Sequence, residues 1–394
     1  MAGALGGVRV ADFSRVLAGP YATMLLGDLG AEVTKIERPG SGDETREWGP
    51  PYDADGVATY FLGVNRNKRS VALDLSTPDG LTAALEIARR ADVLVENFKP
   101  GTMERLGLGY ADLRRTNPGV VYCSITGFGA GDGKDLPGYD LVVQAVGGLM
   151  SVTGPGEGQP TKVGVALVDV VAGLHAALGI LAALRHRDRT GKGQRIQISL
   201  LGSLLSGLVN QASGYVAAGV VPGILGNAHP SIAPYEAYDV ADGKMVLAVG
   251  NDRQFADACE VLGLTKVARD RRFRTNADRV RNRRKLNQVL APALRKRTRD
   301  EWFELMRAAG VPCGPINDLA GAFAFAEHLG LTPTVDVLDP RRDEPVRQVR
   351  NPIRMSATPP SYRLAPPALD EDGDDVRAEI GHAPAETAGS PPAE

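Results

Sequence analysis

The chain has 394 residues, of which 43% are hydrophobic and 23% charged. These values are typical of a globular protein that buries a large core, and the length is enough for two domains. A net charge of −2 and an aromatic content of 5% argue against a nucleic-acid partner and against an anionic membrane surface. The three cysteines are far apart and form no CxxC pair, so we expect no disulfide framework or zinc site. With no secretory signal pattern at the start, these features predict a cytoplasmic protein.

The first half of the chain alternates short β-branched runs with helical stretches. Strands are expected over residues 8–13, 32–37, 70–74, 92–97, 120–125 and 195–200. Thr77 followed by Pro78 predicts a helix that begins there, and further helices are expected after Gly19 and near Pro100. This alternation predicts an α/β fold, a Rossmann-like large domain with a mostly parallel sheet.

A smaller α+β domain is expected later in the chain. An Asp242-Gly243 turn between residues 235–240 and 244–249 predicts a β-hairpin. We expect residues 1–224 to form the first part of the large domain, residues 225–325 the small domain, and residues 326–394 a return to the large domain that ends in a flexible, acidic and Pro-rich tail. The segment 266–300 has 14 Lys and Arg against three Asp, which favours a solvated helical face over a nucleic-acid patch.

The most unusual segment is the apolar run Val163–Leu184. It spans 22 residues, and Asp169 is its only formally charged side chain. The length would allow a membrane span, but Asp169, His175 and three glycines favour a buried strand over residues 163–168 followed by a buried helix.

Asp169 would then lie at a strand–helix junction, where two interpretations stay open. Aspartate is a preferred N-cap residue, and its charge stabilises a helix N-terminus. The same backbone N–H groups would also keep a carboxylate ionised among apolar walls, as a carboxylate nucleophile requires.

The glycine-rich segment 127–133 lacks the GxGxxG register, and the chain has no P-loop. It is either a surface loop or a mobile active-site loop. No HExxH, GxSxG or His/Cys/Asp cluster is present, so no metal site is expected.

The chain resembles the family III CoA-transferases from Gly7 to about His382. The segments that carry the resemblance are residues 9–13 (RVADF), 18–22 (AGPYA), 29–33 (LGAEV), 35–39 (KIERP), 65–70 (NRNKRS), 95–101 (VENFKPG), 124–129 (SITGFG), Asp169 with Gly173, and 189–194 (RTGKGQ). The resemblance implies a CoA-transferase of the EC 2.8.3 type, with CoA or acyl-CoA as substrate and no tightly bound cofactor. It also implies an interlocked homodimer, in which each subunit forms a ring threaded by the other.

In this family the aspartate that matches Asp169 is the nucleophile. The resemblance implies that it attacks the donor thioester to give an acyl-aspartyl anhydride, and that CoA thiolate then forms an aspartyl-CoA thioester unless the acceptor carboxylate intervenes first. Both intermediates hydrolyse, so a closing loop such as 127–133 would exclude water.

Further site residues follow from the matched segments. Those implied in CoA binding are Val16, Ala18, Arg38, Leu73, Asn97, Phe98 and Arg105. Residues 229–235 and 251–255 are closest to members that act on succinyl- or glutaryl-CoA, for which Arg15 and Arg46 would bind a distal carboxylate and Tyr139 would contact the substrate.

Two departures from related members are informative. Related racemases have Gly-His-Asp where this chain has Gly138-Tyr139-Asp140, and a tyrosine is a poor two-way proton carrier at neutral pH. Residues 250–255 replace a run of glycines, which leaves their role as a lid open. The alternatives to transfer are an acyl-CoA racemase or isomerase, and a non-catalytic CoA-binding protein in which Asp169 only caps a helix.

Overall fold

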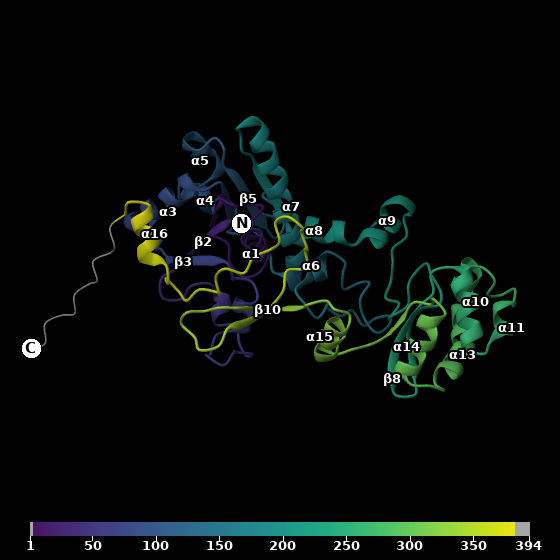
Figure 1. The fold of residues 1–394 in the computed structure, drawn as a ribbon. Coiled ribbons are helices and arrows are strands. Elements are labelled where there is room, and N and C mark those ends of the chain that lie inside the picture. The colour runs from purple at the N-terminus through teal and green to yellow at the C-terminus, as the bar shows by residue number, and fades with distance from the viewer. Residues whose placement is uncertain (1–2, 383–394) are drawn as a thin grey trace, which may run out of the picture. The chain divides into compact units, whose positions relative to one another are not determined.

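A computed structural model describes residues 3–382 and divides the chain into two compact units (Figure 1). The first unit comprises Met1–Gly147, Val163–Ala218 and Thr332–Glu394, and the second comprises Gly148–Lys162 and Gly219–Leu331. Residues 148–162 join the second unit, although no sequence pattern set them apart. The end of the expected flexible tail, beyond residue 382, lies outside the described residues.

The first unit is built on a parallel sheet of six strands in the order β3-β2-β1-β4-β5-β6. The strands are β1 (Arg9–Asp12), β2 (Glu32–Glu37), β3 (Lys68–Ala72), β4 (Val93–Glu96), β5 (Val121–Thr126) and β6 (Arg195–Ser199). Val10 pairs with Val33 on one side and with Val93 on the other, so β1 is central. This order confirms the predicted Rossmann-like α/β fold with a parallel sheet, and it places a topological switch between β1 and β4, where such sheets bind ligands.

Helices and short turns surround this sheet. They are α1 (Ala18–Asp28), η1 (Glu44–Arg46), α2 (Thr59–Leu62), α3 (Pro78–Arg90), α4 (Thr102–Arg105), α5 (Tyr110–Thr116), α6 (Asp140–Val146), α7 (Leu167–Thr190), α8 (Leu200–Gly207), α9 (Val209–Ala218) and α16 (Gly373–Glu379). The Thr77 hydroxyl accepts a hydrogen bond from the Gly80 amide at 3.1 Å, which confirms the predicted start of α3. One core cluster on the sheet contains Phe13, Leu94 and Tyr122.

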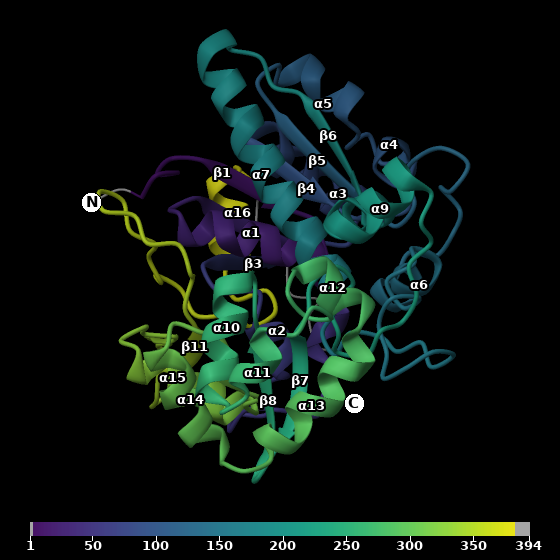
Figure 2. The same cartoon turned by 90° about the vertical axis from the view of Figure 1, so that its right-hand side faces the viewer.

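The apolar run folds differently from the prediction. Residues 163–168 form no strand, and α7 begins at Leu167. The helix can begin this early because the Asp140 carboxylate, on α6, accepts a hydrogen bond from the amide N–H of Val168 at 2.8 Å. This bond satisfies one of the free N–H groups of the helix N-terminus. Among the described residues α7 is the one helix long and apolar enough to cross a membrane. In the first unit it lies beside α1 and also contacts α8, β5 and β6 (Figure 2).

The second unit contains the predicted hairpin, β7 (Tyr235–Val240) and β8 (Gly243–Ala248), extended by β9 (Cys313–Pro315). Its helices are α10 (Asp252–Val261), α11 (Thr265–Ala268), α12 (Asn276–Arg281), α13 (Arg283–Leu294), α14 (Arg299–Ala308) and α15 (Leu319–His328). Part of the basic segment serves internal contacts. Arg279 is fully buried, donates to the Ala233 carbonyl at 2.7 Å and pairs with Asp252 at 2.8 Å.

The last part of the chain returns to the first unit through a hairpin of β10 (Thr334–Val337) and β11 (Val346–Val349). A buried network fastens it there. Arg66 pairs with Asp28 at 2.7 Å and donates to the Gln348 side chain at 3.2 Å, while the Asn351 side chain donates to Asp28 at 3.0 Å. Residues some 320 positions apart therefore share one polar cluster in the core.

Candidate active site

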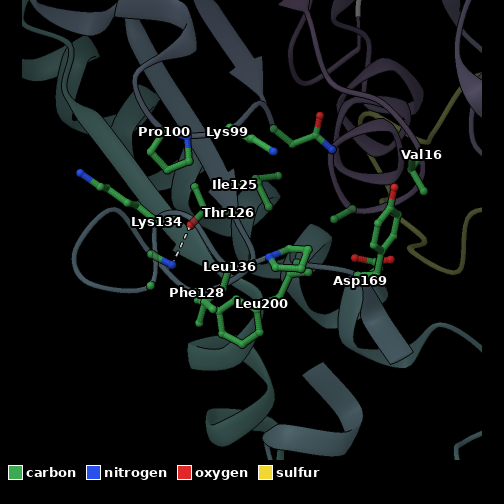
Figure 3. A pocket seen from close by; sticks show the side chains of 18 of the residues that line it. Val16, Lys99, Pro100, Ile125, Thr126, Phe128, Lys134, Leu136, Asp169 and Leu200 are labelled. Atoms are coloured by element: carbon green, nitrogen blue, oxygen red, sulfur yellow. Dashed lines mark hydrogen bonds between the residues drawn. The ribbon is translucent and has the colours of Figure 1, made fainter. Parts of the chain in front are cut away.

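A cavity of about 240 Å³ opens at the carboxyl ends of β1, β4 and β5 (Figure 3). Its walls come from the loops that follow these three strands, and from the starts of α7 and α8. Figure 3 shows Asp169 on the same side of the cavity as Val16, apart from Lys99 and Pro100. The switch point of the sheet thus brings Asp169 to loops more than 30 residues away from it in sequence.

Asp169 is not a helix cap. The N-cap position of α7 is Ala166, and Asp169 lies in the first turn. The capping role belongs to Asp140, which accepts the amide N–H groups of Val168 and Asp169 at 2.8 and 3.2 Å. The Asp169 carboxylate is therefore free of the capping duty that one interpretation of the sequence gave it. No local pattern could indicate Asp140, because it lies 29 residues before the amide that it binds.

The surroundings of Asp169 favour its protonated form. Burial raises its pKa, and the like charge of Asp140 raises it further, from 3.8 to about 7. No cation of the described chain offsets these effects. At neutral pH the carboxyl is close to its titration midpoint, so its ionised form is available but poorly solvated.

Tyr60 on α2 is a neighbour that the sequence did not indicate. Burial and the charge of Asp169 raise the pKa of Tyr60 to about 12, so the phenol keeps its proton. Its ring packs edge to face with that of Trp48, with centroids 5.3 Å apart.

A single glycine allows α7 to approach α1 closely enough to place Asp169. A Cβ at Gly173 would lie 2.7 Å from the carbonyl oxygen of Ala18 and 3.2 Å from the Tyr21 ring. Gly173 is one turn after Asp169, on the same face of the helix. The close crossing therefore brings Asp169 to the start of α1, where Val16 and Ala18 line the cavity.

A second cavity, of about 320 Å³, lies beside the first. Its lining includes Phe13, Arg15, Arg38, Leu73 and Phe98, and Arg15 lines both cavities. The Arg15 guanidinium lies 5.1 Å from the centre of the Phe98 ring. Arginines beside an apolar, aromatic wall suit a nucleotide with phosphate groups.

The structure thus brings most of the expected site residues together. Arg15, Arg38, Leu73 and Phe98 line the second cavity, and the first contains Arg15, Val16, Ala18, Asn97, Tyr139 and Asp169. Lys99 and Lys134 also line the first cavity, and the sequence did not single them out.

Two predicted residues line neither of these cavities. Arg105 lies on α4, where it donates to the Thr102 hydroxyl at 3.1 Å. Arg46 donates twice to Glu37, at 2.9 and 2.6 Å, and its guanidinium lies 3.8 Å from the centre of the Phe61 ring. The roles predicted for these two arginines stay predictions.

The glycine-rich loop after β5 is closed at its base. A Cβ at Gly127 would lie 2.4 Å from the Cα of Gly138, so only glycines fit where the two ends meet. The Thr126 hydroxyl accepts the Gly129 amide at 3.1 Å and fixes the first turn (Figure 3). Residues 127–138 therefore form a loop along the cavity wall. Across residues 3–382, no group of His, Cys, Asp or Glu could hold a metal ion.

Comparison with known proteins gives a consistent set of matches. The model of CoA-transferase family III matches residues 5–373. The chain is 43% identical to the succinate–glutarate CoA-transferase of Agrobacterium fabrum over 382 residues, which covers 95% of each protein. It is 45% identical to the succinyl-CoA:glutarate CoA-transferase of Mus musculus, over 83% of this chain and 76% of that protein. A CAIB/BAIF family protein from Brucella suis superposes with a TM-score of 0.86 at 41% identity, over 96% of this chain and 100% of that one.

Proposed function

This chain belongs to CoA-transferase family III, and on that premise we propose that it transfers CoA from an acyl-CoA to a dicarboxylic acid through covalent intermediates on Asp169. The observation that carries the proposal is the position of Asp169. Its carboxylate does not cap α7, no cation among residues 3–382 offsets the rise in its pKa, and it lies in a cavity next to one suited to a nucleotide.

The reaction needs no redox step. A carboxylate oxygen of Asp169 forms a bond to the acyl carbon, the carbon–sulfur bond breaks, and CoA leaves as its thiolate. The thiolate attacks the Asp169 carbonyl of the anhydride, which releases the donor acid and leaves an aspartyl-CoA thioester. The acceptor carboxylate and the thiolate repeat these steps in reverse, which gives the new acyl-CoA and the free carboxylate.

Burial of Asp169 supports this chemistry. A poorly solvated carboxylate is more nucleophilic than a solvated one, and its raised pKa is consistent with that environment. The loop 127–138 supplies apolar wall residues, including Phe128 and Leu136, that exclude water from the anhydride.

Dicarboxylic acids are the proposed substrates because two relatives are named for succinate or succinyl-CoA and glutarate. Arg15 is the better placed of the two arginines considered for the distal carboxylate. It lines both cavities and has one exposed ion pair, with Glu44 at 2.7 Å, whereas Arg46 lines neither cavity and donates twice to the buried Glu37.

The test is direct trapping of the intermediate. The enzyme is incubated with succinyl-CoA, treated with hydroxylamine and digested, and the Asp169 peptide is examined by mass spectrometry. We expect a hydroxamate at Asp169, which Asp169→Ala loses together with transfer. A fully active Asp169→Ala variant would refute the role of Asp169, and deuterium wash-in at the α-carbon would favour a racemase.

The acid specificity has its own assay. Succinate, glutarate and oxalate are compared with butyrate, a monocarboxylic acid of similar length to succinate. Equal kcat/KM for butyrate and succinate would contradict the dicarboxylate proposal without affecting the role of Asp169.

We also propose an interlocked homodimer in the cytoplasm. In support, α7 exposes Leu174 and Leu178, and α9 exposes Val216, which are apolar side chains that a partner subunit would cover. The three separate free cysteines suit a reducing compartment. A stable and fully active monomer on gel filtration would contradict the dimer, and export of the native protein would contradict the location.

A further inference from the structure

Side chains form hydrogen bonds with the backbone in the short connection between β1 and α1. Every amide and carbonyl group from the Ser14 amide to the Val16 amide has such a partner. Asp12 accepts the Ser14 amide at 3.0 Å, and Lys35 donates to the Ser14 carbonyl at 2.9 Å. The Asn97 side chain binds both the amide and the carbonyl of the next residue, at 2.9 and 2.7 Å. Asp43 accepts the Val16 amide, with both oxygens at 3.2 Å. Five consecutive backbone groups are therefore fixed by four side chains, that of Asp12 at the end of β1 and those of Lys35, Asp43 and Asn97 from other parts of the first unit.

Val16, the last residue of this stretch, has a backbone conformation that is unfavourable for its β-branched side chain. Val16 has φ of 69°, in the left-handed region, which β-branched residues avoid. Such a conformation persists only where its surroundings impose it, and it tends to occur at functional sites. The chain turns at Val16 directly into Leu17 and Ala18, which line the cavity that contains Asp169. Within the described residues, no hydrogen bond uses the amides of Leu17 or Ala18.

The group that holds the Val16 amide is part of a fully buried ion pair. Lys35 and Asp43 approach to 2.9 Å, and neither side chain is exposed. Burial alone would raise the pKa of Asp43. The charge of Lys35, its hydrogen bond, and two hydrogen bonds from Thr45 instead lower this pKa to about 2, so the carboxylate stays ionised. A buried ion pair often contributes little net stability compared with apolar residues of the same size. The contacts of this one suggest a role in fixing backbone geometry.

We infer that Asp43, held by Lys35, is a positioning residue for CoA transfer: it holds Val16 in the left-handed conformation, so that the backbone of Leu17 and Ala18 lies beside Asp169 with free amides for the developing oxyanion. The inference rests on the proposed function. Asn97 has a separate task, because it holds Arg15, the residue shared with the second cavity. Loss of Asp43 should therefore affect the chemical step, and loss of Asn97 should affect CoA binding.

The test compares Asp43→Asn with a matched control, Asp28→Asn. Asp28 is also fully buried and paired with an arginine, but it lies away from the turn at Val16. We expect Asp43→Asn to lower kcat about tenfold, because an L-residue prefers to leave the left-handed region by about that factor. Its KM and the Kd of CoA from calorimetry should change less than about threefold, and Asp28→Asn should lose stability while the folded enzyme keeps its kcat.

A rescue variant separates positioning from general support of the fold. Glycine adopts positive φ freely, so Val16→Gly should restore most of the kcat that Asp43→Asn loses. If Asp43→Asn does not fold, Lys35→Gln with Asp43→Asn replaces the ion pair by two neutral amides, and the same loss and rescue are expected. Full kcat without the carboxylate, or no rescue by glycine, would overturn the inference.

A crystal structure of Asp43→Asn keeps this inference distinct from the proposed function. We expect Val16 at negative φ in that variant, whatever reaction the enzyme performs. If the wild type transfers no CoA, the proposed function fails, and the φ of Val16 still decides whether Asp43 holds the turn. An unchanged positive φ in the variant would refute that role.

Discussion

Replacing Asp169 with asparagine should stabilise the protein above neutral pH while it abolishes transfer. Raising a carboxyl pKa from 3.8 to about 7 corresponds to a destabilisation of about 4 kcal/mol once the group ionises, since each tenfold change in proton affinity is worth about 1.4 kcal/mol. Asp169 is only partly buried, so we expect about 2 kcal/mol. The folded state binds the proton more tightly than the unfolded state does, so the stability of the wild type falls as pH rises from about 4 to about 7.

The assay is urea unfolding of the wild type and Asp169→Asn at fixed protein concentration, from pH 4 to pH 9. The difference in free energy of unfolding should be near zero at pH 4, grow up to about pH 7 and then stay constant. Asp132→Asn, in an exposed part of the loop after β5, is the control and should change stability by less than about 0.5 kcal/mol throughout. A constant difference at all pH values would show that Asp169 is not held in a poorly solvated site, and the reasoning would fail.

Three further predictions follow from the geometry of the site. The kcat/KM for acyl-CoA should rise with pH up to about 7, as Asp169 ionises. Asp140→Asn should move the midpoint of this pH profile to lower pH, because it removes a like charge near Asp169. An unchanged midpoint would exclude an electrostatic effect of Asp140 on Asp169. Gly173→Ala should lower kcat at least tenfold and destabilise the protein by about 1–3 kcal/mol, since its Cβ would overlap the α1 backbone. Gly214→Ala on α9, where the space is open, should have neither effect in thermal melts and transfer assays. Arg38→Ala should raise KM for acyl-CoA more than Arg105→Ala does, because of these two arginines only Arg38 lines the second cavity. A larger KM increase for Arg105→Ala in steady-state kinetics would contradict the assignment of CoA to that cavity.

Local sequence patterns predicted the sheet of the first unit well, because its strands β1 to β5 are short, mostly buried runs bounded by turn residues. The residues 32–37 match β2 at both ends. The apolar run around Asp169 was harder, since strands and helices buried on all sides have similar composition. Its helix begins earlier than predicted because Asp140, from another element, satisfies its first amides. A tertiary contact of this kind leaves no mark on the local pattern.

The candidate site was predictable only in part for the same reason. Asp169 was conspicuous as a charge within an apolar run, whereas Tyr60 lies in the short helix α2 and belongs to no recognisable motif. The resemblance to a family indicated Val16 and Asn97, but not that Asn97 binds the backbone of Arg15. Contacts between a side chain and distant backbone depend on the fold as a whole.

The polar network around Arg66 and Asp28 constrains the order in which the protein can assemble. Both residues belong to the first fifth of the chain, but their partners Gln348 and Asn351 are made close to its end. During synthesis the parallel sheet can form while one of its buried charge clusters still lacks these partners, which costs stability. Closing so long a loop is slow but adds little further entropy cost per residue. The first unit therefore reaches its full stability only when the chain is almost complete, and a fragment that stops before residue 332 would keep Asp169 without the segment that secures the core of the unit.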